Sequence, residues 1–182
     1  LPENYLLFVG YLSPKKNLEV VLHAMFRLKT EGLDTTLVVV GKRGYGSESF
    51  FELVESLSLQ ESIIETGFVS NEELTLLYRH AGLFVFPSIY EGFGLPVVEA
   101  MACGAPVLAS DAGPLPELVE DSRCLSAPHA VNEWADGIRR AVTDKEYRQW
   151  AREYGLEREK LFSWEDAARR LRGIYSEAVE PG

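Results

Sequence analysis

Two glutamates flank a glycine-rich turn in the segment PSIYEGFGLPVVEAMACGAPV, which spans residues 87–107. Glu91 stands just before the turn, and Glu99 follows it in the next apolar stretch. Ionised carboxylates only accept hydrogen bonds, so they suit hydroxyl groups and are repelled by phosphates. We therefore interpret the two glutamates as acceptors that bind hydroxyl groups of a ligand. The alternative is that both glutamates merely complement a helix dipole.

The turn between the glutamates has the composition of an anion site. Gly92 and Gly94 allow a tight bend and a close approach of a ligand to the backbone. Pro96 suits the first turn of a helix, where its missing N–H costs nothing. The N–H groups of Phe93, Gly94 and Leu95 are then expected to be unpaired at a helix start, where phosphates bind. Phosphate on these amides and hydroxyls on the glutamates together describe a nucleoside diphosphate that carries a sugar.

Two other loops follow apolar runs and carry cations. The loop GYLSPKKN contains Lys15 and Lys16, and the loop GKRGYG contains Lys42 and Arg43. An ammonium or guanidinium group in either loop can neutralise a diphosphate. The alternative for each of them is a solvated side chain on the surface.

Short apolar runs alternate with amphipathic segments along the first two thirds of the chain. Such runs are typical of buried parallel strands, and the sequence predicts strands at 5–10, 35–41, 63–67, 82–87 and 106–110, with a weak sixth at 123–127. Helical periodicity and capping residues predict helices at 18–31, at 47–57 with Ser47 as N-cap, through His80 after a Ser70–Glu73 capping box, and at 94–102.

The alternation predicts a Rossmann-like α/β/α fold in three layers, with a parallel sheet of five to six strands. Ligands bind such sheets beyond the carboxyl ends of the strands, where all the loops described above belong. Three successive helices are predicted at 131–143, 145–161 and 164–178, the last with Ser163 and Asp166 as a capping pattern. We expect one domain over 1–182, with a core at 1–127, a helical segment at 128–182 and a frayed end at 179–182.

The composition excludes several classes of protein. A net charge of −10 over 182 residues argues against a nucleic-acid partner or a general membrane-surface binder. The two cysteines, Cys103 and Cys124, lack CxxC spacing, which favours a reducing compartment, and we expect Cys103 to be buried and inert. No His, Cys and Asp cluster has metal-ligand spacing, and no apolar run is long enough to cross a bilayer.

The segment at 87–107 resembles the E-x7-E signature of the retaining glycosyltransferases of family 4, also called glycosyl transferases group 1. The loop GYLSPKKN resembles the donor-phosphate loop of that family, and VVVGKRGYG, IIETGFVSNEELTLLYRHAGLFVFPS and FSWEDAARRLRGIY follow in the family's order. The resemblance covers essentially the whole chain. It implies the C-terminal, donor-nucleotide-binding half of a GT-B fold, with the N-terminal acceptor domain absent from this chain.

The resemblance also implies roles for single residues. Glu91 would contact hydroxyls of the transferred sugar, Lys16 would bind the diphosphate, and these two are the implied catalytic residues. Glu99 would hold the ribose hydroxyls. The full donor-binding set implied by the resemblance is Gly10, Lys15, Lys16, Gly41, Lys42, Phe68, Val69, Glu91, Gly92, Phe93, Gly94, Leu95 and Glu99.

Two parts of this set keep an alternative open. Many family members have Arg directly after the first glycine, where this chain has Tyr11, so either Lys15 compensates or the donor binds more weakly. Phe68 and Val69 follow the third predicted strand, where the family places the base, but ordinary core packing explains them equally well.

The activity implied is retaining, metal-independent transfer of a hexose from a GDP-mannose-like or UDP-sugar donor to a glycan or lipid-linked acceptor, with no cofactor. The resemblance places the enzyme in the cytoplasm, at the cytoplasmic membrane face through the missing domain. Alone, the chain is expected to bind nucleotide weakly and to transfer sugar poorly, and an apolar patch that includes Phe162, Trp164, Leu171 and Tyr175 is expected to be exposed.

Three other functions compete with this one. A non-catalytic nucleotide-sugar-binding module would use the same residues for affinity only. An epimerase of the same fold would need its own acid–base groups. A dinucleotide oxidoreductase expects G-x-G-x-x-G after the first strand, which GYLSPKKN lacks.

Overall fold

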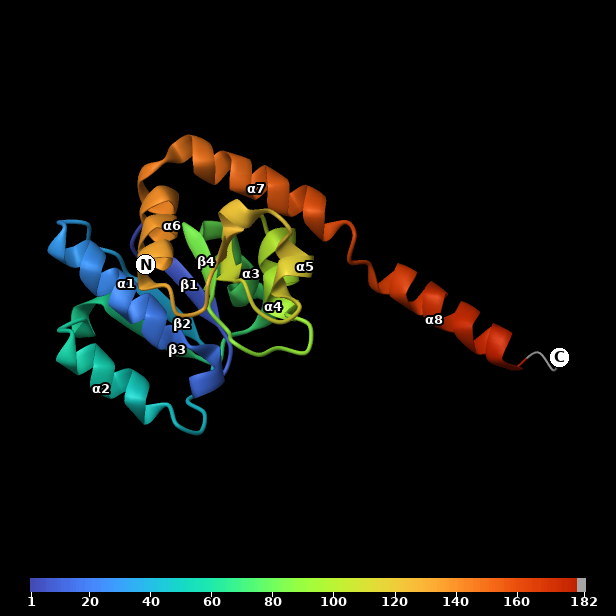
Figure 1. Ribbon diagram of the computed structural model, residues 1–182, viewed down its shortest axis with the longest axis horizontal. Coiled ribbons are helices and arrows are strands. Elements are labelled where there is room, and N and C mark those ends of the chain that lie inside the picture. Colours follow the sequence, from blue (N-terminus) through green and yellow to red (C-terminus); the bar gives the residue numbers. More distant parts are fainter. Residues whose placement is uncertain (180–182) are drawn as a thin grey trace.

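A parallel sheet of six strands in the order β3-β2-β1-β4-β5-β6 forms the centre of the molecule (Figure 1). The computed structural model describes residues 1–179, so most of the segment predicted to fray lies outside the described residues. The strands are β1 (Leu6–Val9), β2 (Leu37–Val40), β3 (Ile63–Gly67), β4 (Leu83–Phe86), β5 (Val107–Ser110) and β6 (Leu125–Ser126). Each predicted strand is therefore confirmed to within about two residues at either end.

Helices cover both faces of the sheet and confirm the three-layer α/β/α architecture. Figure 1 shows α1, α2 and α6 on one side and α3, α4 and α5 on the other, with α7 passing from α6 to α4. The helices are α1 (Leu18–Thr30), α2 (Glu48–Ser56), α3 (Asn71–His80), α4 (Leu95–Ala102), α5 (Leu115–Val119), α6 (Val131–Thr143), α7 (Lys145–Glu159) and α8 (Trp164–Val179).

The four central strands are almost entirely apolar because helices bury them on both faces. All residues of β2, β4 and β5 are buried, and β1 is buried except at Val9. After β1, the chain adds β2 and β3 on one side of this strand. It then returns and adds β4 on the other side of β1, so the strand order switches between β1 and β4. That reversal is the point of the sheet where ligands are expected.

Most of the capping residues predicted at the helix ends are confirmed. The capping box of α3 is present, with Ser70 and Glu73 bonded to each other's backbone amides. The amide of Asp166 donates to Ser163 Oγ at 3.3 Å, which confirms the capping pattern before α8. Ser47 precedes α2 as predicted, but its side chain makes no capping bond because the residue itself has helical backbone angles.

The helix α5 is not among the helices predicted from the sequence. Its residues Leu115, Leu118 and Val119 are buried beneath the glycine-rich turn and β5. Five residues with two prolines nearby give too short a periodic pattern to be distinguished from a turn.

Arginines of α7 bind the carbonyl ends of several helices, which sequence patterns did not predict. The guanidinium of Arg152 donates to the carbonyl oxygens of Gly104 at 2.6 Å and Ala81 at 3.0 Å. Arg148 binds the carbonyls of Ala141 and Val142, at the end of α6. The last carbonyls of a helix have no partner within it, so these bonds fix α7 across the ends of the other helices.

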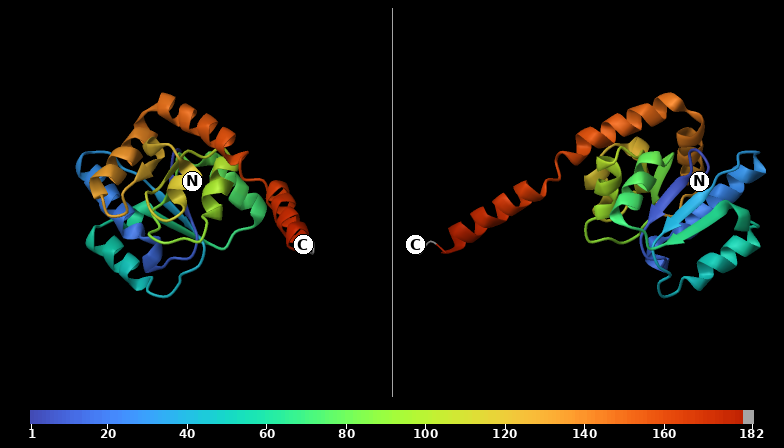
Figure 2. Two further views of the ribbon diagram at one scale, coloured as in Figure 1. Left: turned by 45° about the vertical axis from the view of Figure 1, so that its right-hand side comes forward. Right: turned by 180° about the vertical axis from the view of Figure 1, so that it is seen from behind.

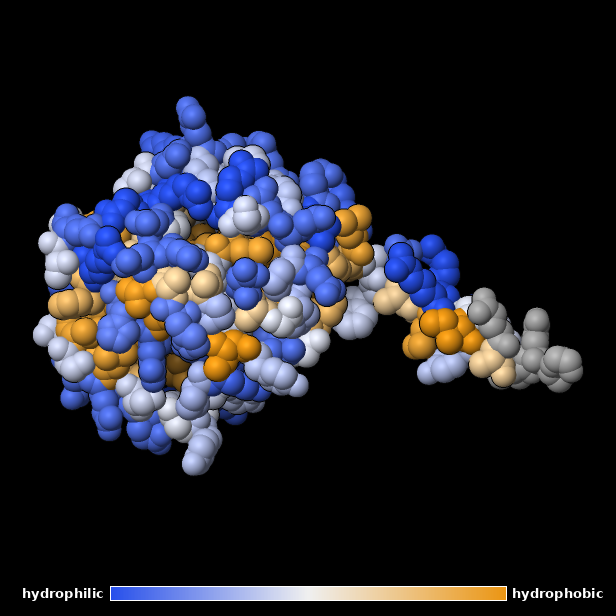
Figure 3. Space-filling view, in the orientation of Figure 1, coloured by the Kyte–Doolittle hydropathy of each residue, from blue (hydrophilic) through white to orange (hydrophobic). Residues whose placement is uncertain are grey.

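The helix α8 extends away from the rest of the molecule (Figures 1 and 2). Trp164, Leu171 and Tyr175 are exposed on it as predicted, and Figure 3 shows apolar side chains gathered on this helix. Phe162 departs from the prediction because its ring packs at the turn before α8, so that it is only half-buried rather than fully exposed. Within residues 1–179 no helix has the length and hydropathy that a membrane span requires.

Candidate functional site

The loops at the carboxyl edge of the sheet are joined through three glycines. The amide of Gly10 donates to Val40 O, and the amide of Gly41 donates to Gly67 O, each at 2.9 Å. Gly41 has a φ of +133°, and a Cβ at this position would lie 2.2 Å from Gly10 O. Because only glycine permits this contact, the first two loops are held side by side at the crevice, as predicted for Gly10 and Gly41.

The first loop is also tied to the segment that carries Glu91. Asn17 has left-handed backbone angles, and its side-chain amide donates to Pro87 O at 3.2 Å and to Pro128 O at 2.7 Å. The amide of Ile89 donates to Lys15 O at 3.0 Å. Asparagine is one of the few residues that tolerate this conformation, and its NH₂ group supplies two donors.

Lys16 and Glu91 form an ion pair at this junction. Lys16 Nζ lies 2.5 Å from Glu91 Oε1, with side-chain exposures of 12% and 14%. The ammonium also lies 4.9 Å from the centre of the Phe86 ring. The alternative reading of Lys16 as a solvated surface lysine is therefore wrong. The structure brings together the two residues whose predicted ligands are a diphosphate and a sugar.

The turn after Glu91 leaves its amides available. Gly94 has a φ of +107° and stands at the N-cap of α4, directly before Leu95 and Pro96. Among the residues that the structure describes, the N–H groups of Phe93, Gly94 and Leu95 donate to no protein acceptor. The start of α4 is thus a cluster of unpaired donors at the positive end of a helix.

Glu99 projects from the second turn of α4, since no acidic residue lies in the first. Helix-dipole effects fall off within the first turn, so complementing the dipole does not account for Glu99. Its Oε2 accepts a hydrogen bond from the hydroxyl of Tyr78 at 3.2 Å. Tyr78 is 2% exposed, and burial, followed by the negative charge of Glu99, raises the pKa of this phenol. Tyr78 is not among the site residues predicted from the sequence.

A row of aromatic rings lies beneath the two carboxylates. Tyr78 meets Phe84 edge-on at 5.4 Å, Phe84 stacks on Phe86 at 5.8 Å, and Phe86 stacks on Phe8 at 6.5 Å. Phe84 and Phe86 lie two positions apart on β4 and therefore on the same face of the sheet. The row thus connects Tyr78, the partner of Glu99, with Phe86, the ring below Lys16.

The side chains of other predicted site residues make no bond to this cluster. Lys15 and Lys42 are exposed, and Arg43 pairs with Glu65 at 2.8 Å while lying over the Phe51 ring. Phe68 is 83% exposed, so the alternative of core packing is wrong for this residue, whereas Val69 is half-buried against the core.

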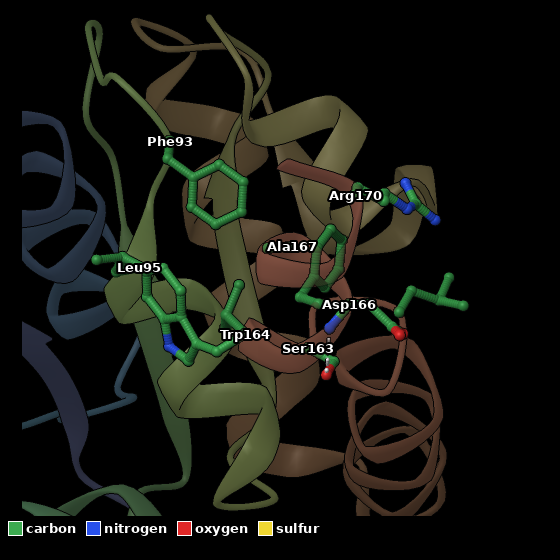
Figure 4. Close-up of a pocket in the computed structure, with 10 residues that line it drawn as sticks. Phe93, Leu95, Ser163, Trp164, Asp166, Ala167 and Arg170 are labelled. Carbon is green, nitrogen blue, oxygen red and sulfur yellow. Dashed lines mark hydrogen bonds between the residues drawn. The ribbon is translucent and has the colours of Figure 1, made fainter. Parts of the chain in front are cut away.

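A cavity of about 360 Å³ adjoins the turn on the side of α8 (Figure 4). Its apolar lining includes Leu95, Leu161 and Trp164, and Phe93 packs edge-on against Phe162 with ring centres 6.1 Å apart. Phe93 thus has its amide in the donor cluster and its ring in this cavity.

The remaining reactive groups are isolated. Within the described part of the chain, no three His, Cys, Asp or Glu residues are grouped so as to hold a metal ion. Cys103 is half-buried rather than buried as predicted, because it lies at the C-terminal end of α4, and burial raises the pKa of its thiol. Ser88, after β4, is fully buried, and its hydroxyl has no partner among the described residues.

Comparisons with known proteins show which family and fold the chain is similar to. Residues 1–158 match the sequence profile of the family described as "Glycosyl transferases group 1". The chain is 36% identical over 174 residues to O-antigen chain mannosyltransferase B of Escherichia coli, covering 95% of this chain and 46% of that protein. It superimposes on sucrose-phosphate synthase from Thermosynechococcus elongatus with a TM-score of 0.88 and 31% identity, covering 98% of this chain and 46% of that one.

A second similar structure is that of Alr3699/HepE from Anabaena, in complex with UDP and glucose. The TM-score is 0.83, and the match covers 96% of this chain and 48% of that one. At 23% identity this likeness shows the fold alone. The chain spans 46% of the length of O-antigen chain mannosyltransferase B and 21% of the length of a serotype-specific mannosyltransferase WbdA of Escherichia coli, to which it is also similar.

Proposed function

The chain belongs to the glycosyl transferases group 1 family and forms the C-terminal half of a GT-B fold, and on this premise we propose that it binds the nucleotide-sugar donor of a hexosyltransferase. The donor lies in the crevice beyond the carboxyl ends of β1, β2 and β4. Residues 1–182 act as one donor-binding domain, with a core at 1–127 and C-terminal helices at 128–182, and the acceptor binds to a separate N-terminal domain.

The observation that carries the proposal is the combination of unpaired amides and a partly buried cation at one edge of the sheet. The amides of residues 93–95 bind the diphosphate, and Lys16 leaves Glu91 to neutralise it. Glu91 then accepts hydroxyls of the sugar, and Glu99 accepts those of the ribose. Acceptors and donors are thereby matched to the parts of a nucleoside diphosphate sugar.

The catalytic role of these groups is to stabilise the leaving diphosphate. The bond between the anomeric carbon and the diphosphate oxygen breaks, and the acceptor oxygen bonds to that carbon on the same face. Attack on the face that the diphosphate leaves retains the configuration, and the acceptor proton passes to the departing diphosphate. Charge develops on the diphosphate, where Lys16 and the amides of 93–95 stabilise it without a metal, each such preorganised donor contributing about 3 kcal/mol.

The transferred sugar is proposed to be a hexose. The Escherichia coli relative is named as a mannosyltransferase, which supports a GDP-mannose-like donor, and the Anabaena structure contains UDP, which supports a UDP-sugar. Phe68, exposed after β3, and Val69 are proposed to border the base.

Titration of the 182-residue chain with UDP, GDP, ADP and NAD tests donor binding. We expect one nucleoside diphosphate to bind and NAD not to bind. Lys16→Ala should weaken binding tenfold to a hundredfold, as expected for about 1.5–3 kcal/mol from a charged hydrogen bond. Lys160→Ala, which removes an exposed lysine that pairs with Glu157, is the matched control. Equal affinity in Lys16→Ala and the wild type would exclude Lys16 as the diphosphate ligand.

Catalysis is tested in the whole protein that contains this domain. Lys16→Ala should lower turnover by a factor of about 10²–10³, and treatment with a metal chelator should leave turnover unchanged. The 182-residue chain alone should transfer sugar poorly or not at all. A Glu91→Gln variant that loses only affinity and keeps turnover would indicate a binding module instead of a transferase.

A further inference from the structure

The carboxylate of Glu99 does not stand alone, because a tyrosine from a different helix holds it. We propose that Tyr78 positions Glu99 for the ribose hydroxyls and thereby strengthens the preference of this domain for ribonucleotides over their deoxy analogues. The inference rests on the proposed function, in which Glu99 is the ribose-binding residue. Tyr78 acts through Glu99 and is therefore a positioning residue.

Burial makes the position of the Tyr78 hydroxyl well defined. Tyr78 is 2% exposed and is the one buried residue of α3, with its ring edge-on to Phe84 on β4. A buried hydroxyl needs a hydrogen-bond partner, and Glu99 Oε2, at 3.2 Å, is the partner it has among the described residues. Burial raises the pKa of this phenol, so it remains a neutral donor near neutral pH.

The bond leaves Glu99 with acceptor capacity to spare. A carboxylate has two oxygens with about four lone-pair sites, and Tyr78 uses one of those on Oε2. Glu99 is exposed, so its remaining acceptor sites are accessible to a ligand. A free glutamate would lose rotamer freedom when it binds a hydroxyl, whereas one already held by Tyr78 loses less. Pre-organisation of this kind strengthens the bond to a ribose hydroxyl specifically.

Tyr78→Phe removes the hydroxyl and keeps the ring that packs on Phe84. The 182-residue chain, as wild type and variants, is titrated with UDP and with 2′-deoxy-UDP and 3′-deoxy-UDP, or with the GDP series if GDP binds more tightly. We expect Tyr78→Phe to weaken UDP binding and leave the deoxy analogues nearly unchanged. The preference for the ribonucleotide should fall by about threefold to tenfold, the range expected for the net contribution of one typical hydrogen bond.

Tyr5, directly before β1, offers a matched control because its hydroxyl contacts the same helix α3. It is 3% exposed, and its hydroxyl donates to Leu77 O, one residue before Tyr78, at 2.7 Å. Tyr5→Phe removes a buried tyrosine hydroxyl that does not touch Glu99, so it should change the melting temperature without changing the ribose preference. Glu99→Gln should abolish most of the preference, and Tyr78→Phe should have no further effect in the Glu99→Gln background.

The outcomes separate the inference from the proposed function. If Glu99→Gln lowers the preference but Tyr78→Phe does not, the inference is overturned and the role of Glu99 stands. If Tyr78→Phe weakens the ribonucleotide and the deoxy analogues equally, Tyr78 only supports the fold, and the inference is again overturned. If Glu99→Gln leaves the preference for ribonucleotides unchanged, neither the ribose-binding role of Glu99 nor its positioning by Tyr78 is correct. The effect of Lys16→Ala on affinity still tests donor binding independently.

Discussion

The ammonium nitrogen of Lys16 lies 2.5 Å from Glu91 Oε1, although 75 positions separate the two residues in the chain. In the proposed function these groups bind different parts of the donor, so the pair must open when a diphosphate arrives. Each side chain meanwhile keeps a partner in a site that is mostly shielded from water. Part of the free energy of donor binding is therefore used to separate Lys16 from Glu91.

This competition predicts an unusual result for Glu91→Gln. Loss of the carboxylate frees Lys16, so binding of UDP or GDP without a sugar should tighten by about fivefold, the equivalent of about 1 kcal/mol for an ion pair. Any preference for the nucleotide sugar over the bare nucleotide should disappear. Calorimetric titration measures both. Glu65→Gln, which breaks the exposed pair with Arg43, is the control and should change neither affinity.

Asn17→Asp should weaken nucleotide binding by about tenfold and lower the free energy of unfolding. The substitution removes two donors and turns a carboxylate toward the carbonyls of Pro87 and Pro128, at a cost of about 1–3 kcal/mol. Thermal melting and titration report the two effects. Asn4→Asp is a suitable control, because Asn4 also has a positive φ but is exposed before β1. Unchanged affinity in Asn17→Asp would mean that Lys16 is placed without this clamp.

Gly94→Ala and Gly92→Ala form a second matched pair. A Cβ on Gly94 would lie 2.8 Å from Leu115 Cδ2 and would sit on a backbone with φ of +107°, whereas a Cβ on Gly92 meets nothing within 4 Å. Gly94→Ala should destabilise the protein by about 1–3 kcal/mol and disturb the amides of the turn. Gly92→Ala should leave the unfolding midpoint in denaturant nearly unchanged. Equal midpoints for the two variants would contradict this assignment of strain.

Arg152→Ala should lower the free energy of unfolding by on the order of 3 kcal/mol, because it leaves carbonyls at the ends of α3 and α4 without partners. Chemical denaturation measures the change. Arg169→Ala removes an exposed arginine that pairs with Asp166 and should cost far less. Similar losses for the two variants would show that the bonds from α7 to the helix ends contribute little.

Stability should fall as the pH rises above about 9. Burial raises the pKa of the Cys124 thiol to about 11, so between its unfolded and folded pKa values the folded chain retains a proton that the unfolded chain loses. The unfolded state then binds fewer protons, and the free energy of unfolding decreases with pH. Cys124→Ala should make this slope shallower by as much as about one proton per molecule. An unchanged slope in denaturation curves between pH 9 and 11 would contradict the assignment.

Much of the fold was predictable because each strand and most helices carry a local signal. The apolar runs that became β1, β2, β4 and β5 are short and continuous, as parallel strands buried on both faces must be. The capping box at Ser70 and Glu73 marks the start of α3 within four residues of sequence. Local sequence patterns do not predict α5, because this helix is too short to show helical periodicity.

The chain's sequence by itself determined the residue types of the site. It also determined the spacing of Glu91, the glycine turn and Glu99, because turn and helix geometry are local. Tertiary structure alone decided that Lys16 would meet Glu91, that Tyr78 would meet Glu99, and that Arg152 would reach the ends of other helices. These contacts depend on β4 lying beside β1 and on α7 crossing α4. Strand order and helix docking follow from the packing of the whole core, which hydrophobic periodicity along the chain does not encode.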